Sequence, residues 1–314
     1  MILSHATILS KGNGVVAGAS PRPNLTITDS TFTALNPGSP THQMCVYADA
    51  PASLTIEHDQ FTDCQGILVN GEGLTTSPFS ASYNNYTDIG RYGQTDWLAG
   101  AVHTDGVNAP GATLDWNRIT SHYGISVSED VFGLVDTNGA QGRPVEVGHN
   151  LVNGDYPYRG DGSSFSGVAF DLSDVNGSYQ NAHDNTAVNY AGSGFAADTG
   201  SHIRFTNDTA VSDGLADNEA RVNATFGGGF STWHNPSYPA SGPDLYVANS
   251  TSGQLRWTGS SWERANFYLP HCDPSTACTG NTTLGTVNGA DEQAAITAYE
   301  KSVTAAGVTI GPRP

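Results

Sequence analysis

Short runs of alternating hydrophobic and polar residues recur along the chain, and each ends in the same kind of turn. A run rich in β-branched or aromatic residues, such as 25–27 or 54–56, leads to a polar residue, one spacer and an apolar residue. A period of two is typical of β-strands. A unit of about 20 to 35 residues cannot bury its own apolar face, so the repetition predicts a β-solenoid of stacked units. The polar turn residues are Ser30, Asp59, Asn84, Asn117, Asn150, Asn185 and Asp208.

A second series of short strands is predicted after glycine, where an apolar residue follows directly. The period of two places the first and third residues of each strand inward and the fourth outward. Two or three strands per unit predict a parallel β-helix in which strands of successive coils lie about 4.8 Å apart. We interpret the Asn turns as architecture, because stacked Asn side chains can hydrogen-bond from coil to coil. The glycines are Gly66, Gly106, Gly124, Gly167 and Gly194, and the outward residues are Asn70, Ser128, Asp171 and Asp198.

The pattern divides the chain into two regions. Residues 1–225 carry the coils, and because the first residues already follow the pattern, we expect an N-terminal cap to be missing. Residues 226–314 are irregular and are predicted to cap the solenoid with a hairpin, made by 245–247 and 254–257, and one helix. That helix is expected at 290–306, with acidic residues in its first turn and Gly307 as its C-terminal stop.

Composition narrows the choice of partners. The chain has 12 Lys and Arg against 30 Asp and Glu, a net charge of −18, so it is not expected to bind nucleic acid or an anionic membrane surface. No stretch of about 18 apolar residues is present, so no membrane insertion is expected. The charge favours a neutral polysaccharide as partner, or an acidic one with Ca²⁺ as a possible cofactor.

The four cysteines indicate an oxidising compartment. Cys45 and Cys64 lie in neighbouring units, and Cys272 and Cys278 form the tightest pair in sequence, for which we expect a disulfide. Lysine occurs only twice, whereas Ser, Thr and Asn are abundant. These features favour an extracellular, secreted protein or one on a virion surface.

The densest group of candidate catalytic residues surrounds Asp105. His103 and Asp105 precede Gly106, and His122 precedes Gly124, so counting from the glycines places all three on one edge. Carboxylates one or two coils apart lie about 5–10 Å from each other, a range in which a pair can cleave a glycosidic bond. We therefore assign Asp105 as the acid, tuned by His103 and His122, with Asp130 or Asp171 as its partner.

Residues around this group are expected to bind substrate. Aromatic rings on loops can stack on sugar rings, and an arginine could serve as base or charge neutraliser in a lyase. No Asp-rich calcium loop of the EF-hand type occurs, so the ligands of a metal stay unassigned. The substrate-binding candidates are Tyr92, Trp97, Asn108, Arg118, Tyr156, Tyr158, Arg159 and Asp198.

The units resemble the right-handed parallel β-helix superfamily, the pectate-lyase-like fold, which includes polysaccharide-active proteins and phage tailspikes. The resemblance covers about residues 1–225, and its motifs look like those of uncharacterised secreted or phage-borne members. It implies an all-β, right-handed, single-stranded parallel β-helix and a connection to polysaccharides. The paired Asp-Asp motif of the polygalacturonase branch and the Asp-Pro-His motif of the epimerase branch are missing. The motifs are residues 103–108, 117–119 and 150–156.

Three functional hypotheses follow. The first is a glycoside hydrolase that degrades an extended polysaccharide bound along the β-helix face. The second is a non-catalytic glycan-binding or structural β-helix, such as a phage tailspike or a surface adhesin, which a homotrimer would favour. The third is a polysaccharide lyase.

Overall fold

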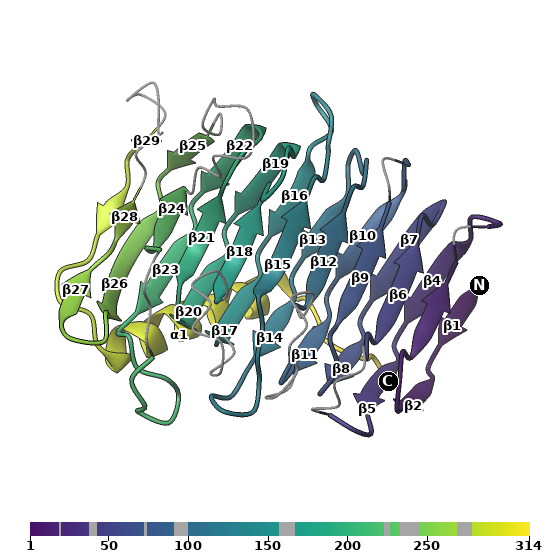
Figure 1. Ribbon diagram of the computed structural model, residues 1–314, viewed down its shortest axis with the longest axis horizontal. Helices are drawn as coiled ribbons and strands as arrows, with labels where there is room; N and C mark the ends of the chain where they lie inside the picture. The colour runs from purple at the N-terminus through teal and green to yellow at the C-terminus, as the bar shows by residue number, and fades with distance from the viewer. Residues whose placement is uncertain are drawn as a thin grey trace.

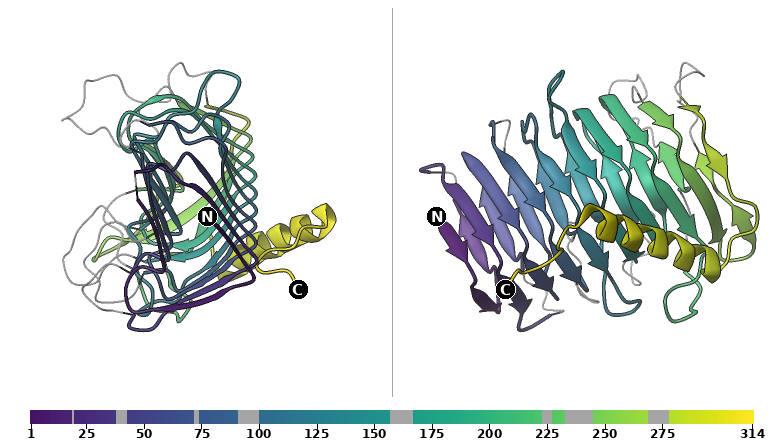
Figure 2. Two further views of the ribbon diagram at one scale, coloured as in Figure 1. Left: turned by 90° about the vertical axis from the view of Figure 1, so that its right-hand side faces the viewer. Right: turned by 180° about the vertical axis from the view of Figure 1, so that it is seen from behind.

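The computed structural model of the protein describes residues 1–18, 20–37, 43–71, 74–90, 100–156, 167–222, 227–232, 245–268 and 278–314. The chain winds in coils, and each coil passes in turn through three sheets, which we name A, B and C (Figure 1). Neighbouring strands of a sheet come from successive coils and run parallel, as Leu25 beside Leu54 in sheet A illustrates. Viewed along the long axis, the sheets enclose one interior (Figure 2). The predicted parallel β-helix is confirmed.

Within each sheet the strands follow the order of the coils. Sheet A contains β1 (Ile2–Ser4), β4 (Asn24–Thr28), β7 (Ser53–Glu57), β10 (Phe79–Ser82), β13 (Thr113–Asp115), β16 (Val145–Gly148), β19 (Ser178–His183), β22 (Ser201–Thr206), β25 (Leu245–Ala248) and β29 (Cys278–Thr279). Sheet B contains β2 (Thr7–Ser10), β5 (Thr31–Ala34), β8 (Gln60–Thr62), β11 (Asn85–Thr87), β14 (Arg118–Thr120), β17 (Leu151–Asp155), β20 (Thr186–Tyr190), β23 (Thr209–Ser212), β26 (Thr251–Trp257) and β27 (Trp262–Arg264), and β30 (Thr282–Thr283) also pairs with β26. Sheet C contains β3 (Val15–Ala17), β6 (Val46–Asp49), β9 (Ile67–Asn70), β12 (Val102–Asp105), β15 (Asp130–Val135), β18 (Val168–Leu172), β21 (Ser193–Ala197), β24 (Phe230–Thr232) and β28 (Phe267–Tyr268).

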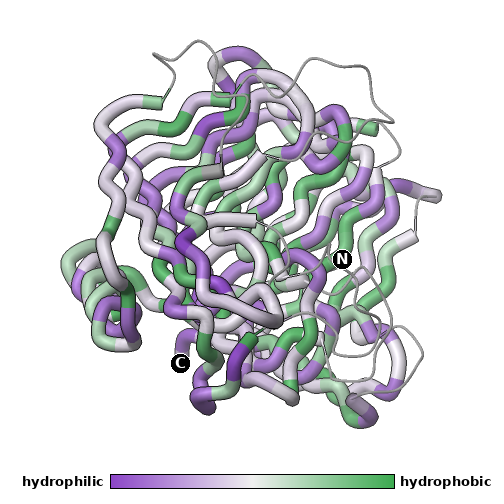
Figure 3. Tube along the Cα trace, turned by 60° about the vertical axis from the view of Figure 1, so that its left-hand side comes forward, coloured by the Kyte–Doolittle hydropathy of each residue, from purple (hydrophilic) through white to green (hydrophobic). Residues whose placement is uncertain are grey.

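Aromatic side chains stack in columns inside the coils. On sheet C the ring centroids of Phe132 and Phe170 are 5.0 Å apart, and those of Phe170 and Phe195 are 4.8 Å apart. Each of these rings is fully buried, which contributes about 1.5–3 kcal/mol per side chain to folding. Hydrophobic and hydrophilic residues alternate along the coils (Figure 3), as the period of two requires. The columns form because parallel strands place equivalent residues directly above one another.

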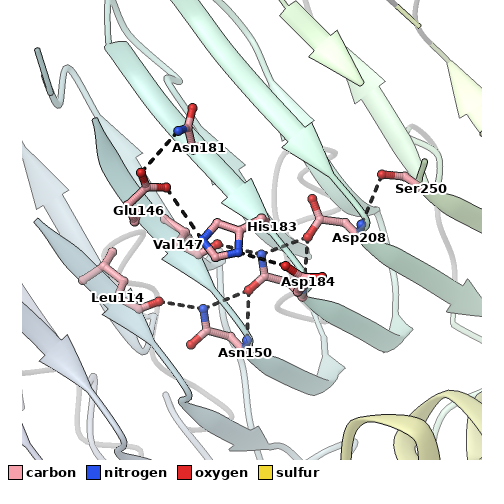
Figure 4. A network of polar contacts seen from close by, with 10 residues as sticks. Leu114, Glu146, Val147, Asn150, Asn181, His183, Asp184, Asp208 and Ser250 are labelled. Carbon is pink, nitrogen blue, oxygen red and sulfur yellow. Dashed lines mark hydrogen bonds and ion pairs between the residues drawn. The ribbon is translucent and has the colours of Figure 1, made fainter. Parts of the chain in front are cut away.

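A ladder of buried Asn side chains marks the corner between sheets A and B (Figure 4). The Asn117 N–H donates to Asn150 Oδ1 at 2.8 Å, and the Asn150 N–H donates to Asn185 Oδ1 at 3.0 Å. Asn150 Nδ2 also donates to the Leu114 carbonyl at 2.7 Å. The coil-to-coil hydrogen bonds expected of these residues are therefore present. The left-handed backbone falls on the residue before each ladder residue, for example on His149 with φ 55°.

The stacking continues past residue 225, where the sequence pattern becomes irregular. Strand β25 pairs in parallel with β22, and β26 pairs in parallel with β23. These two strands therefore lie in different sheets, and the hairpin predicted between them does not form. Ser250, which joins them, belongs to the ladder instead, because its hydroxyl accepts a hydrogen bond from the Asp208 N–H at 3.2 Å. The hairpin that does form joins β26 to β27.

A disulfide joins Cys45 to Cys64, which lie in neighbouring coils as the sequence indicated. The bridge expected between Cys272 and Cys278 stays a prediction, because Cys272 lies outside the described residues. The observed disulfide closes a loop with a sequence separation of 19 residues. The oxidising compartment that the cysteine count indicated stays a prediction.

The predicted C-terminal helix is present as α1 (Gly289–Ala306). Asn288 caps its first turn together with Asp291, and Gly307 ends it in the left-handed conformation, as expected. The helix does not cover the end of the solenoid. Tyr299 and Val303 pack against Val188 and neighbouring residues on the outer face of sheet B, and α1 runs along that side (Figure 2). No helix among the described residues, α1 included, has the length and apolarity needed to cross a bilayer.

The segment after α1 continues toward the first coils, and we call residues 307–314 the C-terminal strap. The Gly311 N–H donates to the Tyr83 carbonyl at 2.7 Å. Further on, Arg313 Nε and Nη2 donate to the two carboxylate oxygens of Asp29, each at 2.8 Å. Hydrogen bonds from Arg313 lower the pKa of Asp29 to about 2. The strap thus links α1 to coils that lie far from it along the axis.

We expect Arg313→Ala to loosen the second coil specifically. Amide hydrogen exchange in β4 and β5 should become faster, while exchange in β20 should not change. Because the Asp29 pKa is lowered in the folded state, the contribution of the ion pair is fully present above about pH 4 and is lost as the pH falls through about 2. The difference in melting temperature between the variant and the wild type should therefore be largest near pH 6 and become small at pH 2. Lys301→Ala, an exposed change on α1, is the control.

Candidate functional site

Carboxylates gather on the outer face of sheet C across four successive coils. Asp105 ends β12, Asp130 begins β15, and Asp171 lies within β18. Four strands of a parallel sheet span about 14 Å along the axis. We name this group the acidic row; its members are Asp105, Glu129, Asp130, Asp171, Asp174 and Asp198.

The strand register places His103 beside this row. His103 pairs with Gly133, and Gly133 pairs with Asp171, so all three occupy one outward line across β12, β15 and β18. A Cβ atom added to Gly133 would lie only 2.8 Å from His103 Nδ1 and 3.5 Å from the Cβ of Asp130. Because Gly133 has no side chain, the His103 imidazole can occupy the space above it, next to the carboxylates of the following coils.

The centre of the row is compact and largely buried. Asp171, Asp174 and Asp198 each offer a carboxylate oxygen, and these oxygens lie within 4.8 Å of one another. Asp130 is 6% exposed and Asp171 is 7% exposed. One oxygen of each of these two, Oδ1, is buried without a hydrogen-bond partner among the described residues. Such oxygens are costly to bury unless a proton or a cation satisfies them.

Burial governs the protonation of these acids. Desolvation raises the pKa of Asp130 well above its ordinary value, and the neighbouring Asp171 carboxylate raises it further. The pKa of Asp171 is raised well above the ordinary value by desolvation and then by Asp198. Desolvation also raises the pKa of Asp174. The strongest charge effects on Asp130 and Asp171 come from other carboxylates, which favours a proton retained in the row at neutral pH.

Most of the acids that the sequence singled out meet here. His103, Asp130, Asp171 and Asp198 share the outer face of sheet C, and Asp105 is near enough to Asp174 to raise its pKa. Sequence reasoning missed Asp174 and Glu129. Both lie just outside the strands, where a period of two no longer assigns a face, so the only available signal was the density of acids around 129–130 and 171–174.

His122 is not part of this group. Its Nδ1 lies 2.9 Å from Asp88 Oδ1, at the corner where the chain leaves sheet B, whereas Asp105 ends a strand of sheet C. The glycine alignment that joined the two was wrong. Gly66 precedes its strand, but Gly106 follows β12. The strand predicted at 125–128 does not form either; Ile125 is 39% exposed, and the sheet C strand of that coil is β15.

Three of the predicted substrate-binding residues have other surroundings. Tyr156 is 1% exposed, contacts Tyr123 edge to face and accepts a hydrogen bond from the Asp217 N–H, so it is a packing residue. Arg118 lies on sheet B, where Nη2 pairs with Glu300 Oε2 of α1 at 2.7 Å. Asn108 lies beyond the end of β12, at the corner leading to sheet A. The remaining candidates lie outside the described residues; they are Tyr92, Trp97, Tyr158 and Arg159.

Comparison of the chain with protein-family models, with curated proteins and with solved structures found no match. What the acidic row can do is therefore argued from its own geometry. It combines buried acids whose pKa values are raised with neighbouring, less buried carboxylates, which is the equipment for acid–base chemistry on a polar substrate.

Proposed function

We propose that the protein is a glycoside hydrolase that cleaves an extended polysaccharide along the outer face of sheet C. The observation that carries the proposal is the pair Asp130 and Asp171, two buried carboxyl groups with raised pKa values beside further carboxylates. Glycosidases use one protonated carboxyl group as general acid and a second carboxylate as base or nucleophile. Burial is the usual means of keeping such an acid protonated at neutral pH.

The roles differ from those that the sequence predicted. We assign the general acid to Asp171 or Asp130, because these are the buried members of the acidic row. Asp174 and Asp198 are less buried and lie within reach of Asp171, so one of them serves as the partner carboxylate. Asp105, the acid expected from the sequence, lies at the end of the row, and His103 lies beside the row, next to Gly133.

A second possibility at the same site is Ca²⁺ bound for use on an acidic glycan. The donors of Asp171, Asp174 and Asp198 are all oxygens, and the buried Asp171 Oδ1 has no hydrogen-bond partner within the described part of the chain, so the residues fit a hard cation. When bound, Ca²⁺ supplies positive charge that can hold the carboxylate of an acidic sugar. This would favour the lyase hypothesis, but of the arginines proposed as its base, Arg118 pairs with α1. The hydrolase is therefore the better-supported function.

The test is a panel of neutral and acidic polysaccharides, assayed with and without Ca²⁺. New reducing ends report cleavage, and ultraviolet absorbance of an unsaturated product distinguishes elimination from hydrolysis. Asp171→Asn and Asp130→Asn should each lower the rate by about 10²–10⁴-fold, the usual contribution of general acid–base catalysis. Asp49→Asn is the matched control, because Asp49 ends β6 on the same sheet, two coils before Asp105 and three coils before Asp130.

The variants are expected to remain folded, because the amide replaces a buried acid that has no partner for one oxygen. Their melting temperatures should equal or exceed that of the wild type, so a loss of rate can be attributed to chemistry. If Asp171→Asn keeps full activity on a glycan that the wild type cleaves, the catalytic assignment is wrong. If the wild type binds a glycan but releases no new ends from any, the non-catalytic hypothesis, a tailspike or adhesin, replaces ours.

The disulfide indicates the kind of compartment in which such an enzyme would act. The bond between Cys45 and Cys64 supports a secreted protein or one on a virion surface, where glutathione does not reduce it. Polysaccharides of cell walls and capsules are accessible there. A homotrimer stays a prediction, and size-exclusion chromatography with light scattering would determine the oligomeric state.

A further inference from the structure

A second group of potential ligands lies on another part of the surface, where sheet A meets sheet B. His149, His183 and Asp184 each offer one ligand atom, and these atoms lie within 4.8 Å of one another. The group is separate from the acidic row, which lies on sheet C. We call it the corner cluster. Unlike the acidic row, it contains imidazole nitrogens, and so its chemistry differs.

The backbone brings these three residues together in a regular way. His149 and Asp184 each directly precede a ladder residue, and both have left-handed backbones, with φ 55° and 57°. Because Asn150 and Asn185 are hydrogen-bonded neighbours in the ladder, the residues before them also lie in adjacent coils. His183 is the last residue of β19; its neighbour Ala182 is fully buried, so the His183 side chain faces outward. The ladder therefore fixes the positions of all three.

Neighbouring side chains restrict both imidazole rings. The His149 ring stacks on Trp116, with centroids 4.3 Å apart and planes 14° from parallel, and it meets the His183 ring edge to face at 5.2 Å. His183 Nδ1 lies 3.1 Å from Asp184 Oδ2, and Nε2 lies 3.7 Å from Glu146 Oε2 (Figure 4). Ligands held in this way lose little conformational freedom when an ion binds.

Gly148 provides an independent indication that the cluster is shaped for close approach. In the sheet register Gly148 pairs with His183 on one side and with Asp115 on the other. A Cβ atom at Gly148 would lie 2.7 Å from His183 Nε2 and 2.6 Å from Asp115 Oδ1. The imidazole and this carboxylate therefore share the space above the glycine. Asp115 Oδ1 is buried and has no hydrogen-bond partner among the described residues.

We propose that His149, His183 and Asp184 bind a divalent transition-metal ion, with Zn²⁺ as the best-fitting biological candidate. Two imidazoles with a carboxylate suit Zn²⁺, Ni²⁺ and Cu²⁺, whereas Ca²⁺ prefers oxygen ligands alone. Glu146 and Asp115 lie on the Nε2 side of His183, where they can accept its N–H. That arrangement leaves Nδ1, on the side of Asp184, to face the ion, and it is the usual support of a metal-bound histidine. The ion would join the sixth and seventh coils from outside.

The experiment is calorimetric titration of the metal-free protein with Zn²⁺. It is carried out in the Asp171→Asn background, so that the acidic row contributes as little as possible. We expect one equivalent to bind and the melting temperature to rise with Zn²⁺ and fall again with a chelator. His149→Asn and Asp184→Asn should each weaken binding at least 10-fold. Both should fold, since Asn207 and Asn249 occupy the equivalent left-handed positions in later coils.

His58→Asn is the matched control. His58 also has a left-handed backbone, with φ 60°, and stacks on an aromatic neighbour, Tyr83, at 4.8 Å, but it lies outside the corner cluster. Its replacement should leave the Zn²⁺ affinity unchanged. The proposal is overturned if Zn²⁺ does not bind, if His149→Asn and Asp184→Asn bind it as the parent does, or if Ca²⁺ competes at equal concentration. None of these results depends on glycan cleavage, so this inference and the proposed function can fail separately.

Discussion

Asn150→Ala should destabilise the protein strongly, although it changes a single residue in a turn. The side chain is fully buried and makes hydrogen bonds in both directions along the ladder. Its loss leaves the Asn117 N–H without an acceptor and the Leu114 carbonyl without that donor. Each buried polar group left unsatisfied costs about 1–3 kcal/mol, so the free energy of unfolding should fall by about 2–6 kcal/mol. Urea denaturation followed by circular dichroism measures the change.

The control for this prediction lies in the same coil. Asn153 is partly exposed on the outer face of sheet B, where its Oδ1 accepts one hydrogen bond from Asn189. Asn153→Ala should change the free energy of unfolding by less than about 0.5 kcal/mol, as surface changes usually do. Equal effects of the two substitutions would show that the ladder contributes no more than surface polar contacts.

The second expectation is that the protein is most stable in mildly acidic solution. Several buried acids have raised pKa values in the folded state; burial raises the pKa of Asp59 and of Asp155 to about 8 and the pKa of Glu292 to about 7. Between pH 4 and 8 the folded chain therefore binds more protons than the unfolded chain. Stability must then decrease as the pH rises through this range. Melting temperatures should be highest near pH 4–5 and fall steadily toward pH 8.

Asp59 offers a direct test of this effect, because it occupies a ladder position. Its Oδ1 accepts the Ser30 N–H at 2.6 Å, while Oδ2 is buried and has no hydrogen-bond partner among the residues that the structure describes. At the same place in the next coil, Asn84 Nδ2 donates to the Ile56 carbonyl. We infer that Oδ2 of Asp59, when it carries a proton, acts as the corresponding donor. Raising the Asp59 pKa from 3.8 to about 8 lowers the free energy of unfolding at pH 8 by on the order of 5 kcal/mol, compared with an acid whose pKa is not shifted.

Asp59→Asn should therefore raise the melting temperature at pH 8 and have little effect at pH 5. The amide restores the donor that the ionised acid lacks, and it does not titrate. Asp208, whose pKa burial also raises, should respond in the same way. A stability profile that is flat with pH, or an equal effect of Asp59→Asn at both values, would refute the protonated-ladder interpretation.

The fold could be predicted from the sequence because its signals are local and repeated. The ladder residues and the inward positions 67, 69, 170, 195 and 197 follow directly from the period of two. Register was harder, because glycine adopts a left-handed backbone both before a strand, as Gly66 does, and after one, as Gly106 does. An alignment based on glycine alone cannot separate the two cases. That ambiguity is what placed His122 beside Asp105.

Only part of the candidate site could be predicted, because the period of two assigns a face only to residues inside regular strands. Asp171 was assigned to the outer face because it lies inside a regular strand. Tyr156 was expected to bind substrate from a loop, but it packs into a small cluster of its own with Val222. The packing of such loops depends on residues far away in the sequence. The helix was placed correctly from its caps, whereas its position on sheet B depends on apolar residues that face outward on β17, β20 and β23.

The contact between the strap and the second coil has a consequence for how the molecule is made. Asp29 and Arg313 are 284 residues apart in the chain. Closing so long a loop is entropically unfavourable until the intervening structure holds its ends together. The ribosome also delivers Arg313 long after Asp29. The first coils must therefore stay folded without this ion pair during synthesis, and the ion pair can form only after the chain has been made and folded through α1.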